Sequence, residues 1–595
     1  MDPPPIDGPL SVNSYPPDKT VYNGQSPPRN TVRAAGLFLA DATSSASSTG
    51  GGEPSIAVNP ANPNQVAITR FGGSSWNNNA SVLYSTNGGQ NWTDEASIPP
   101  PPGVQGTAGC PCDQTIDYGR DGRLYGTFLT AGITATHVVT GSTNDPTQAS
   151  AWHWNGNPAQ LTSGNRTNVD QPWLVVNRAP SNRRQDNVYA AYDVGNSTPT
   201  PEARVAVSYG ADPVNITADN KAGGYSNPVV TNPGLRLAAD HRIGTVYALY
   251  EQSAGNILLQ PKTITYKLNR STDGGATWSL NDSADGLTVD TVPSDQAPGY
   301  KFAGNNALLG GIDHAAVDPT NGDVYVVYGE DAGGNNRIKI RRLTPNGSGG
   351  LSVGPASNVS TSTNAALPSV AVLSDGTVGV LYDTFDGTTT AGFPIVSAHL
   401  ARSTDHGATF SDTVLQTFQT PPNNGDPRQR VLGDYQQLKA LGNTFHGVFA
   451  GNLSGVSITN PPIHAIYFRA ANKSPTETRL SSSANPSTYE RPVTFTDTVC
   501  PARSRAGTTT PTGTVTFSDD SRVLGAGTLS PGKGTHCSQT RITTSKLKPG
   551  QHSITAYYSG DGDYLAGPLE RLTQVVECPK HHSRGAGSGG SCRKK

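Results

Sequence analysis

The sequence predicts an all-β protein of two domains, and three observations carry that prediction. The first is composition: the 595 residues include 67 glycines and 47 prolines, with Thr, Ser and Asn between short apolar runs. Many short strands joined by tight turns require this mixture, and we find no convincing long amphipathic helix. The second is a turn pattern that occurs three times, and the third is a longer repeat of paired strands that occurs seven times.

The turn pattern is eight residues long and has the order Ser, Asn or Asp, Gly and an aromatic residue. At its third position a short polar side chain can bond the backbone of its own turn, and at its fifth position a glycine can take a positive φ. The aromatic residue then begins the returning strand and packs inward. The three copies are residues 85–92, 271–278 and 403–410, and a degenerate fourth copy is expected over 142–152.

This pattern resembles the Asp-box, also called the bacterial neuraminidase repeat, of sialidase-like β-propellers. Three copies with the same spacing make the resemblance specific. It implies a propeller in which each box lies between the outer strands of a blade, with its Asp held in the turn and its aromatic side chain between blades. The residues of the boxes are therefore assigned a structural role and are left out of the site.

A longer repeat predicts the inner part of each blade. Each copy has a short apolar strand, a turn of Gly, Asn or Asp, and a second strand rich in Val and Tyr. Self-similarity at a fixed period marks propellers, so we expect seven blades, with six as the alternative because sialidases of the resembled family have six. The paired strands are 54–58 with 65–68, 114–118 with 123–128, 172–176 with 187–192, 235–239 with 244–250, 314–317 with 323–328, 368–372 with 377–382, and 435–438 with 444–449.

A β-sandwich is predicted after Lys473, where strands alternate apolar and polar residues. The stretches 511–517 and 558–567 resemble bacterial immunoglobulin-like repeat domains of secreted and surface proteins, which implies a spacer or adhesive module. An N-terminal strand is expected to close the ring of blades, because an open ring leaves an unpaired edge. The expected segments are an N-terminal extension (1–50), the propeller (51–472), the immunoglobulin-like domain (473–578) and a disordered basic tail (579–595).

Cysteine usage predicts an oxidising compartment, since six cysteines form an even set in a chain rich in Gly and Thr. The first residues lack the basic and apolar regions of a signal peptide, and Met1 is the only methionine. We therefore expect a mature secreted or cell-surface protein. For the sequence Cys110-Pro-Cys112, the alternative to a disulfide is that the two cysteines form half of a metal site. Position groups the cysteines as Cys500 with Cys537, Cys110 with Cys112, and Cys578 with Cys592.

Charge and hydropathy limit the partners. The net charge of −2 argues against a nucleic-acid partner, and no apolar run is long enough to cross a bilayer. We expect a monomer that acts on an extracellular glycan or glycoprotein. No cofactor and no metal centre are predicted, with Ca²⁺ left as an alternative for the carboxylates described below.

The resemblance to retaining sialidases implies an arginine triad for the substrate carboxylate, a tyrosine nucleophile activated by a glutamate, and an aspartate acid/base. Tyr435 matches the nucleophile, and Glu251 or Glu330 would be its partner. The first arginine of the family is missing from the segment that begins at Glu53, and residues 71–80 hold no carboxylate for the acid. The arginines assigned to the substrate carboxylate are Arg70, Arg337, Arg428 and Arg430.

The strand repeat itself predicts a second constellation, because five carboxylates stand at or just before the first inner strands. The ends of these strands meet at one mouth of a propeller channel, where facing carboxylates have raised pKa values unless a cation or N–H groups compensate. They could bind Ca²⁺, supply the acid and base of a glycosidase, or cap their strands by bonding neighbouring blades. Asp113 and Asp170 are assigned as catalytic, and Glu53, Asp313 and Asp434 as substrate-binding.

Two functions follow from these observations. The first is a secreted glycoside hydrolase of the exo-sialidase type that acts on extracellular glycans. The second is a non-catalytic propeller that binds a glycan or a protein, which the missing arginine and the missing aspartate favour.

Overall fold

The computed structural model describes residues 31–579, apart from internal gaps. The gaps are 35–36, 44–51, 71–75, 80, 105–110, 132–135, 156–160, 165, 167–168, 195–200, 211–213, 225–234, 255–261, 295–301, 303–312, 332–335, 361–363, 423–430, 456–460, 474, 503–509, 521, 533–535 and 562. The predictions for Arg428, Arg430, Cys110, Cys592 and the tail from residue 580 lie outside the described residues. The chain divides into two compact units, residues 1–470 and 471–595.

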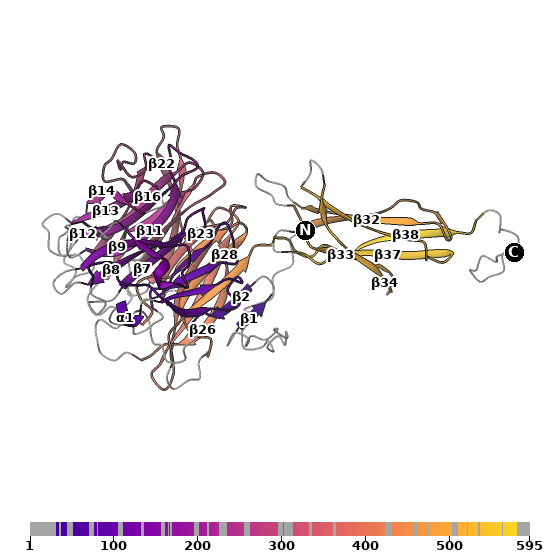
Figure 1. The fold of residues 1–595 in the computed structure, drawn as a ribbon, viewed down its shortest axis with the longest axis horizontal. Coiled ribbons are helices and arrows are strands. Elements are labelled where there is room, and N and C mark those ends of the chain that lie inside the picture. Colours follow the sequence, from indigo (N-terminus) through magenta and orange to yellow (C-terminus); the bar gives the residue numbers. More distant parts are fainter. Residues whose placement is uncertain are drawn as a thin grey trace. The chain divides into compact units, whose positions relative to one another are not determined.

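The described strands of the first unit pair into seven sheets (Figure 1). The first four sheets are β3 (Ser55–Val58), β4 (Val66–Thr69), β5 (Ser81–Ser85) and β6 (Thr93–Ser97); β7 (Pro111–Tyr118), β8 (Leu124–Ala131), β9 (Thr136–Thr143) and β10 (Trp152–Trp154); β11 (Val169–Arg178), β12 (Asp186–Val194), β13 (Glu202–Ser208) and β14 (Ile216–Gly224); and β15 (Arg236–Asp240), β16 (Thr245–Ala254), β17 (Lys262–Ser271) and β18 (Leu287–Ser294). All their neighbouring strands are antiparallel.

The other three sheets complete the unit. They are β19 (Asp313–Val317), β20 (Val324–Asp331), β21 (Asn336–Pro345) and β22 (Leu351–Asn358); β23 (Ala365–Val372), β24 (Val378–Thr388), β25 (Pro394–Ser403) and β26 (Ser411–Gln419); and the five-stranded sheet of β27 (Gln437–Leu441), β28 (Thr444–Gly451), β29 (His464–Ala471), β2 (Leu37–Asp41) and β1 (Thr31–Ala34). The first strand of each sheet packs on the first strands of its two neighbours, and the series closes from β27 back to β3. The sheets therefore form a β-propeller around a central channel.

Side chains of the first strands also tie neighbouring sheets together. Ser55, Thr115, Ser369 and Gln437 occupy the same place in their repeats, and each accepts a backbone N–H of the next sheet. The bonds run from Ile116 N–H to Ser55 Oγ (3.0 Å), Leu174 N–H to Thr115 Oγ1 (3.0 Å), Leu438 N–H to Ser369 Oγ (2.9 Å) and Ile56 N–H to Gln437 Oε1 (3.0 Å). The last of these bonds crosses the closure between the final sheet and the first.

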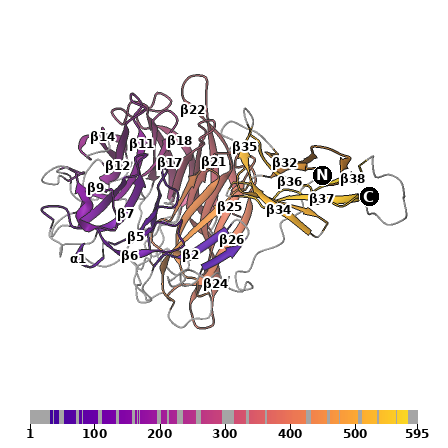
Figure 2. The same ribbon diagram turned by 45° about the vertical axis from the view of Figure 1, so that its right-hand side comes forward.

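The closing sheet contains strands from both ends of the unit. Leu37 to Asp41 of β2 pair with Ala470 to Ile466 of β29, and the indigo β2 lies beside the orange end of the unit in Figures 1 and 2. This pairing covers the edge that β29 would otherwise expose.

The three eight-residue turns share one hydrogen-bond pattern, and each joins the third and fourth strands of its sheet. In the second copy, Gly275 N–H donates to Ser271 Oγ at 2.7 Å and Thr277 N–H donates to Asp273 Oδ1 at 3.0 Å. The same donors and acceptors recur in the other two copies. The polar residues of these turns therefore hold the backbone, as the sequence predicts.

The second unit is a two-sheet sandwich with its own core, which includes Phe495, Phe517 and Tyr558. Cys500 and Cys537 form a disulfide within it, as predicted. Cys112 in the first unit and Cys578 in the second each take part in a disulfide of their own as well. The sheets are β30 (Thr476–Ser482), β32 (Val493–Pro501), β36 (Ser538–Thr544) and β35 (Ser530–Pro531); and β31 (Ser487–Thr488), β38 (Glu570–Glu577), β37 (Gly550–Tyr558), β33 (Thr514–Asp519) and β34 (Arg522–Thr528).

Helix is scarce in the described residues. The one α-helix, α1, spans Trp76–Asn79, and a short 3₁₀ turn spans Ala149–Ala151. Within the described part of the chain, no helix has the length and apolar character needed to cross a bilayer.

Candidate functional site

One end of the channel, which we call the acidic end, is where the first strand of each sheet begins and the second strand ends. Four residues at the same place in their repeats, Glu53, Asp113, Gln171 and Leu367, have left-handed backbones with φ from 45° to 57°. In three of these sheets the pairing register shifts here, as it does at a β-bulge. A left-handed backbone is strained for a residue other than glycine. The fold thus holds these side chains at the channel despite a local conformational cost.

Carboxyl groups dominate the acidic end. Arg236 is the one buried Arg or Lys side chain among the described residues. Carboxyl groups that are removed from water without enough positive charge favour their protonated form. Besides the partly exposed Asp170, the acidic end contains the buried Glu53, Asp113, Asp193, Glu251, Asp313, Asp383 and Asp434.

A first group of carboxyls, Glu53, Asp113, Asp170 and Asp434, lies at or just before the first strands of the first three sheets and of the last. Asp434 N–H donates to Glu53 Oε1 at 3.2 Å, and Gln171 N–H donates to Asp170 Oδ1 at 2.9 Å. Burial and the adjacent Glu53 carboxyl raise the pKa of Asp113 well above its usual range, although a hydrogen bond with Asp170 acts against this rise. Asp113 therefore favours the protonated form, and the group can exchange a proton.

A second group contains Glu251, Asp313 and Asp193. Burial, and then the charge of Asp313, raise the pKa of Glu251 well above its usual range. Burial also raises the pKa of Asp313 to about 7, against the opposing charge of Arg236. Both side-chain oxygens of Glu251 and Oδ2 of Asp313 are buried with no hydrogen-bond partner among the described residues. Buried polar atoms are normally paired, so these oxygens are suited to contact a ligand.

Gln171 links the two groups. Its Nε2 donates to Asp434 Oδ2 at 3.3 Å, and both terminal nitrogens of Arg236 donate to its Oε1 at 3.3 Å. The buried arginine therefore reaches the first group through an amide, while its charge acts directly on the second group.

A layer of aromatic rings supports Arg236. Its guanidinium lies 4.4 Å from the Trp173 ring centre and 5.3 Å from that of Tyr435, within the range of cation–π contacts. The Tyr435 hydroxyl donates to the carbonyl of Gln114 at 3.3 Å. Burial and the Glu53 and Asp113 carboxyls raise the pKa of Tyr435 well above its usual range. The predicted nucleophile thus lies at the acidic end, packed in this layer with its hydroxyl bonded to the backbone.

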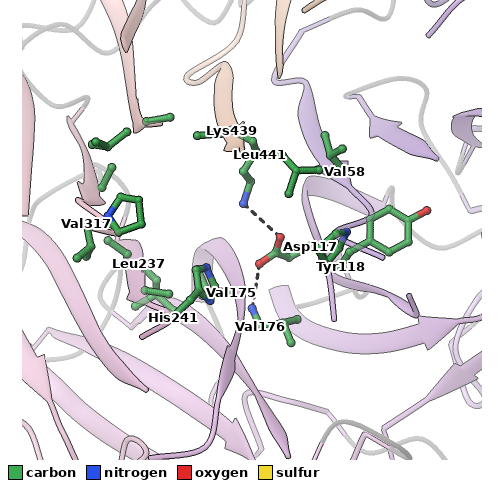
Figure 3. Close-up of a pocket in the computed structure, with 18 of the residues that line it drawn as sticks. Val58, Asp117, Tyr118, Val175, Val176, Leu237, His241, Val317, Lys439 and Leu441 are labelled. Carbon is green, nitrogen blue, oxygen red and sulfur yellow. Dashed lines mark hydrogen bonds and ion pairs between the residues drawn. The ribbon is translucent and has the colours of Figure 1, made fainter. Parts of the chain in front are cut away.

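Beyond the aromatic layer, the channel contains a cavity of about 420 Å³ that Trp173 and His314 help to line. Figure 3 shows Lys439 of β27 and Asp117 of β7 pointing toward each other across it. Lys439 Nζ lies 3.4 Å from Asp117 Oδ1, and Val176 N–H donates to Asp117 Oδ2 at 3.0 Å. Much of the remaining lining is Val, Leu and Ala. Asp117 is therefore paired through both of its oxygens, in contrast to Glu251, whose two side-chain oxygens have no hydrogen-bond partner among the described residues.

Other residues assigned from the resemblance lie elsewhere. Glu330 accepts from Lys339 Nζ at 2.8 Å, so its charge is compensated within its own sheet. Arg337 faces Glu330 in the pairing of β20 with β21 and is exposed. Arg70 directly follows β4 and is partly exposed. Tyr435 and Glu251 are thus the members of that set that the structure places at the acidic end.

Arg236, Asp193 and Asp383 also lie at the acidic end, and the sequence patterns did not predict them. A signal for the two acids exists: each follows a tyrosine near the end of a second strand, as Glu251 does in Tyr250-Glu251. Burial raises the pKa of Asp383 well above its usual range, and its Oδ2 has no hydrogen-bond partner among the described residues. Arg236 carries no such signal, because one arginine within an apolar run is not distinctive.

Comparison with known proteins identifies the second unit. Residues 480–577 match the family of bacterial immunoglobulin-like domains (group 3). No curated protein matches the chain in sequence. The chain is thus a β-propeller followed by a bacterial immunoglobulin-like domain.

Three solved structures illustrate the similarity of fold. A protein of unknown function from Dyadobacter fermentans is 14% identical, with 60% of this chain and 94% of that chain covered and a TM-score of 0.34. An α-L-arabinofuranosidase from Fusarium graminearum is 15% identical, with 60% and 91% covered and a TM-score of 0.34. An endo-1,5-α-L-arabinanase from Thermotoga petrophila is 9% identical, with 71% and 98% covered and a TM-score of 0.29. Because these scores are low, the function proposed below rests on the residues of the site.

Proposed function

We propose that the acidic end is the active site of a glycan-acting propeller, in which carboxyl groups move protons at a glycosidic bond. One observation carries the proposal: seven buried carboxyls share the acidic end with one buried arginine, and oxygens of Glu251, Asp313 and Asp383 have no hydrogen-bond partner among the described residues. Such an arrangement opposes folding stability. Clusters of perturbed carboxyls are typical of sites that need an acid and a base.

The first group offers the two protonation states that this chemistry requires. Asp113 is the general acid, because burial and Glu53 favour its protonated form. Asp170, which is the partly exposed member and accepts the Gln171 N–H, is its partner base, and the two carboxyls share a hydrogen bond through which the proton can pass. Environments that push the pKa values of two carboxyls apart assign the acid and the base in glycosidases. The unpartnered oxygens of Glu251 and Asp313 would accept hydrogen bonds from sugar hydroxyls.

The exo-sialidase form of the proposal assigns the nucleophile to Tyr435 and its activation to Glu251. The geometry supports this form less well, because the Tyr435 hydroxyl bonds a backbone carbonyl and the neighbouring carboxyls raise its pKa. An acid–base pair of carboxyls does not require the Tyr435 hydroxyl to lose its proton. The glycan is expected outside the cell, since structural disulfides persist in oxidising compartments, and the active species is expected to be a monomer.

A non-catalytic propeller that binds a glycan or a protein is the second candidate. It is favoured by the backbone bonds that Glu53 makes at the closure of the ring, where its N–H donates to the Leu432 carbonyl at 3.3 Å and its carboxylate accepts Asp434 N–H at 3.2 Å. A carboxyl with this task contributes to the fold whether or not the site is catalytic.

A glycan panel separates these candidates. Oligosaccharides and fluorogenic glycosides, including a sialoside, would be incubated with the full chain at about pH 5 to 7, where raised carboxyl pKa values keep acid and base forms together. Turnover that Asp113→Asn abolishes supports the proposal. Sialoside cleavage that Tyr435→Phe abolishes would support the sialidase form instead. Saturable glycan binding without turnover favours the second candidate.

A further inference from the structure

A cluster of metal-binding side chains lies in the propeller at residues that the proposed function does not use. One carboxylate oxygen each from Asp318 and Asp323 and one imidazole nitrogen of His406 lie within 4.8 Å of one another. The two aspartates bracket the turn between β19 and β20, and His406 lies in the eight-residue turn between β25 and β26. The cluster therefore spans two neighbouring sheets.

Asp318, a member of this cluster, has one unsatisfied carboxylate oxygen. It is fully buried, and its Oδ1 accepts the Thr320 N–H at 2.7 Å and the Thr320 hydroxyl at 2.6 Å. Its Oδ2 is buried with no hydrogen-bond partner among the described residues. The carboxylate is thus fixed through one oxygen while the other remains available, which is how outer hydrogen bonds orient a metal ligand.

His406 occupies a position that normally belongs to glycine in this chain. The matching residues of the other two turns are Gly88 and Gly274, with φ of 70° and 80°, whereas His406 has φ of 62°. A left-handed histidine is strained relative to glycine. The turn itself does not require an imidazole, because its backbone bonds to Ser403 and Asp405 are those of the other copies.

Asp323 is already oriented. Its Oδ2 accepts from Asn321 Nδ2 at 2.9 Å and from Arg342 Nε at 2.7 Å. Arg342 therefore compensates the charge of Asp323 when no metal is bound. The charge of Asp318 contributes to the raised pKa of the nearby Arg242. The Tyr325 hydroxyl lies 3.5 Å from His406 Nδ1.

We propose that Asp318, Asp323 and His406 bind a divalent transition-metal ion of the zinc class and so lock the two sheets together. One imidazole and two carboxylates suit Zn²⁺, whereas Ca²⁺ and Mg²⁺ prefer sets of oxygen ligands. Tetrahedral Zn²⁺ needs ligand atoms about 3.3 Å apart, so binding would draw together ligand atoms that lie within 4.8 Å of one another, and His406 is the exposed member of the set. The fourth position remains for water.

The test measures zinc binding by the full chain in two ways, by titration calorimetry and by the shift in the melting temperature. All proteins would carry His581→Ala and His582→Ala so that the histidine pair of the tail does not contribute. Zinc should raise the melting temperature of the parent by about 2 °C or more, because a ligand of the folded state stabilises it. Mg²⁺ at the same concentration should have no such effect.

His406→Gly is the decisive variant, because glycine stands at this position in the other two turns. It should fold, melt without metal at or above the temperature of the parent, and lose the zinc-induced shift with at least tenfold weaker binding. Asp318→Asn should also lose the shift. A parent that shows no zinc-induced shift, or a His406→Gly protein that keeps it, would overturn the proposal. Neither readout involves glycan turnover, so the result is independent of the proposed function.

Discussion

The pKa values of single carboxyl groups at the acidic end are set more by burial than by hydrogen-bond or charged partners. Glu251 and Asp313 are almost fully removed from water, and one arginine stands beside both. The turn residue Asp405 shows the opposite case. It is exposed, and hydrogen bonds from Thr409 and Ser403 lower its pKa to about 2. The same residue type is thus tuned in opposite directions by solvent and by hydrogen bonds.

Asp313→Asn should stabilise the protein in a pH-dependent way. The folded state holds the Asp313 proton up to a pKa of about 7, whereas the unfolded chain releases it near the ordinary aspartate pKa of 3.8. Wild-type stability therefore falls as the pH rises through this window. The variant should be more stable than wild type by about 1 to 3 kcal/mol at about pH 7 to 8, and the difference should vanish near pH 4. Urea unfolding at several pH values measures this.

Asp405→Asn provides a control of opposite sign. The folded-state pKa of Asp405 is lowered, so its contribution is present above its unfolded pKa and is lost as the pH falls toward about 2. The variant should be slightly less stable than wild type at neutral pH. A difference for Asp313→Asn that does not change with pH would contradict the protonation argument.

Asp273→Ala should lower stability and leave function unchanged. Asp273 accepts bonds from Ser271 Oγ at 2.8 Å and from Thr277 N–H at 3.0 Å, and both are lost in the variant. We expect the free energy of unfolding to fall by about 1 to 2 kcal/mol. Asp273→Asn should be nearly neutral, because Asn87 makes the equivalent bond in the first turn. Loss of glycan turnover in Asp273→Ala without a change in unfolding would assign these turns a different role.

At the scale of elements, the inner strands could be predicted more fully than the backbone at their ends. The repeat of apolar and Val/Tyr-rich segments identifies the paired first and second strands. The repeat predicts that the first strand of the last pair begins at Tyr435, whereas β27 begins at Gln437. The difference arises because the residues just before β27 form bends, with Gly433 at φ of 81°. At the matching place of three other sheets the pairing register shifts. Period-two patterning contains no signal for such positions.

The candidate site was predictable to a similar degree. Position before a first strand identifies Asp113, Asp170 and Asp434, because strand ends converge in a propeller. Burial, unpartnered oxygens and the packing of Arg236 on Trp173 depend on contacts between sheets. Such contacts leave no local pattern in one sequence. The arginines were assigned by resemblance alone. Arg337, for example, is exposed and faces Glu330 in the pairing of β20 with β21, whereas the acidic end is formed where the first strands begin.

Gly433→Ala should disrupt the junction between the last sheet and the first. A Cβ at residue 433 would lie 2.2 Å from Glu53 Cγ and 2.4 Å from Glu53 N, and the backbone φ is 81°. We expect a loss of more than about 3 kcal/mol, from the steric clash and the left-handed backbone together. Gly442→Ala is the matched control, because its φ is 58° and nothing lies within 4 Å of the added Cβ. Chemical denaturation of both variants measures the difference, and equal losses would contradict the packing argument.

At the scale of the whole molecule, the chain consists of two units that each bury their own core. The propeller depends on pairing between its two ends, through β2 and β29. The sandwich contains the Cys500–Cys537 disulfide, which joins residues 37 apart in sequence.

Replacing both Cys500 and Cys537 by Ala should destabilise the sandwich alone. The loop-entropy model gives a loss of about 3 to 4 kcal/mol for a loop of this length. Calorimetry of the full chain should show one unfolding transition moving to lower temperature while the propeller transition stays in place. An equal shift of both transitions would mean that the two units unfold as one.

The most direct test of the central claim compares two aspartates of the same strand, β7. Asp113 lies at the acidic end, and Asp117 lies four residues further on, paired with Lys439 in the cavity. Glycan turnover by Asp113→Asn and Asp117→Asn would be measured beside the wild type on the best substrate of the panel. Asp113→Asn should lose turnover by about a hundredfold or more, as expected for a general acid, while Asp117→Asn stays within about threefold. Full turnover by Asp113→Asn, with loss in Asp117→Asn, would move the site to the cavity and contradict the account.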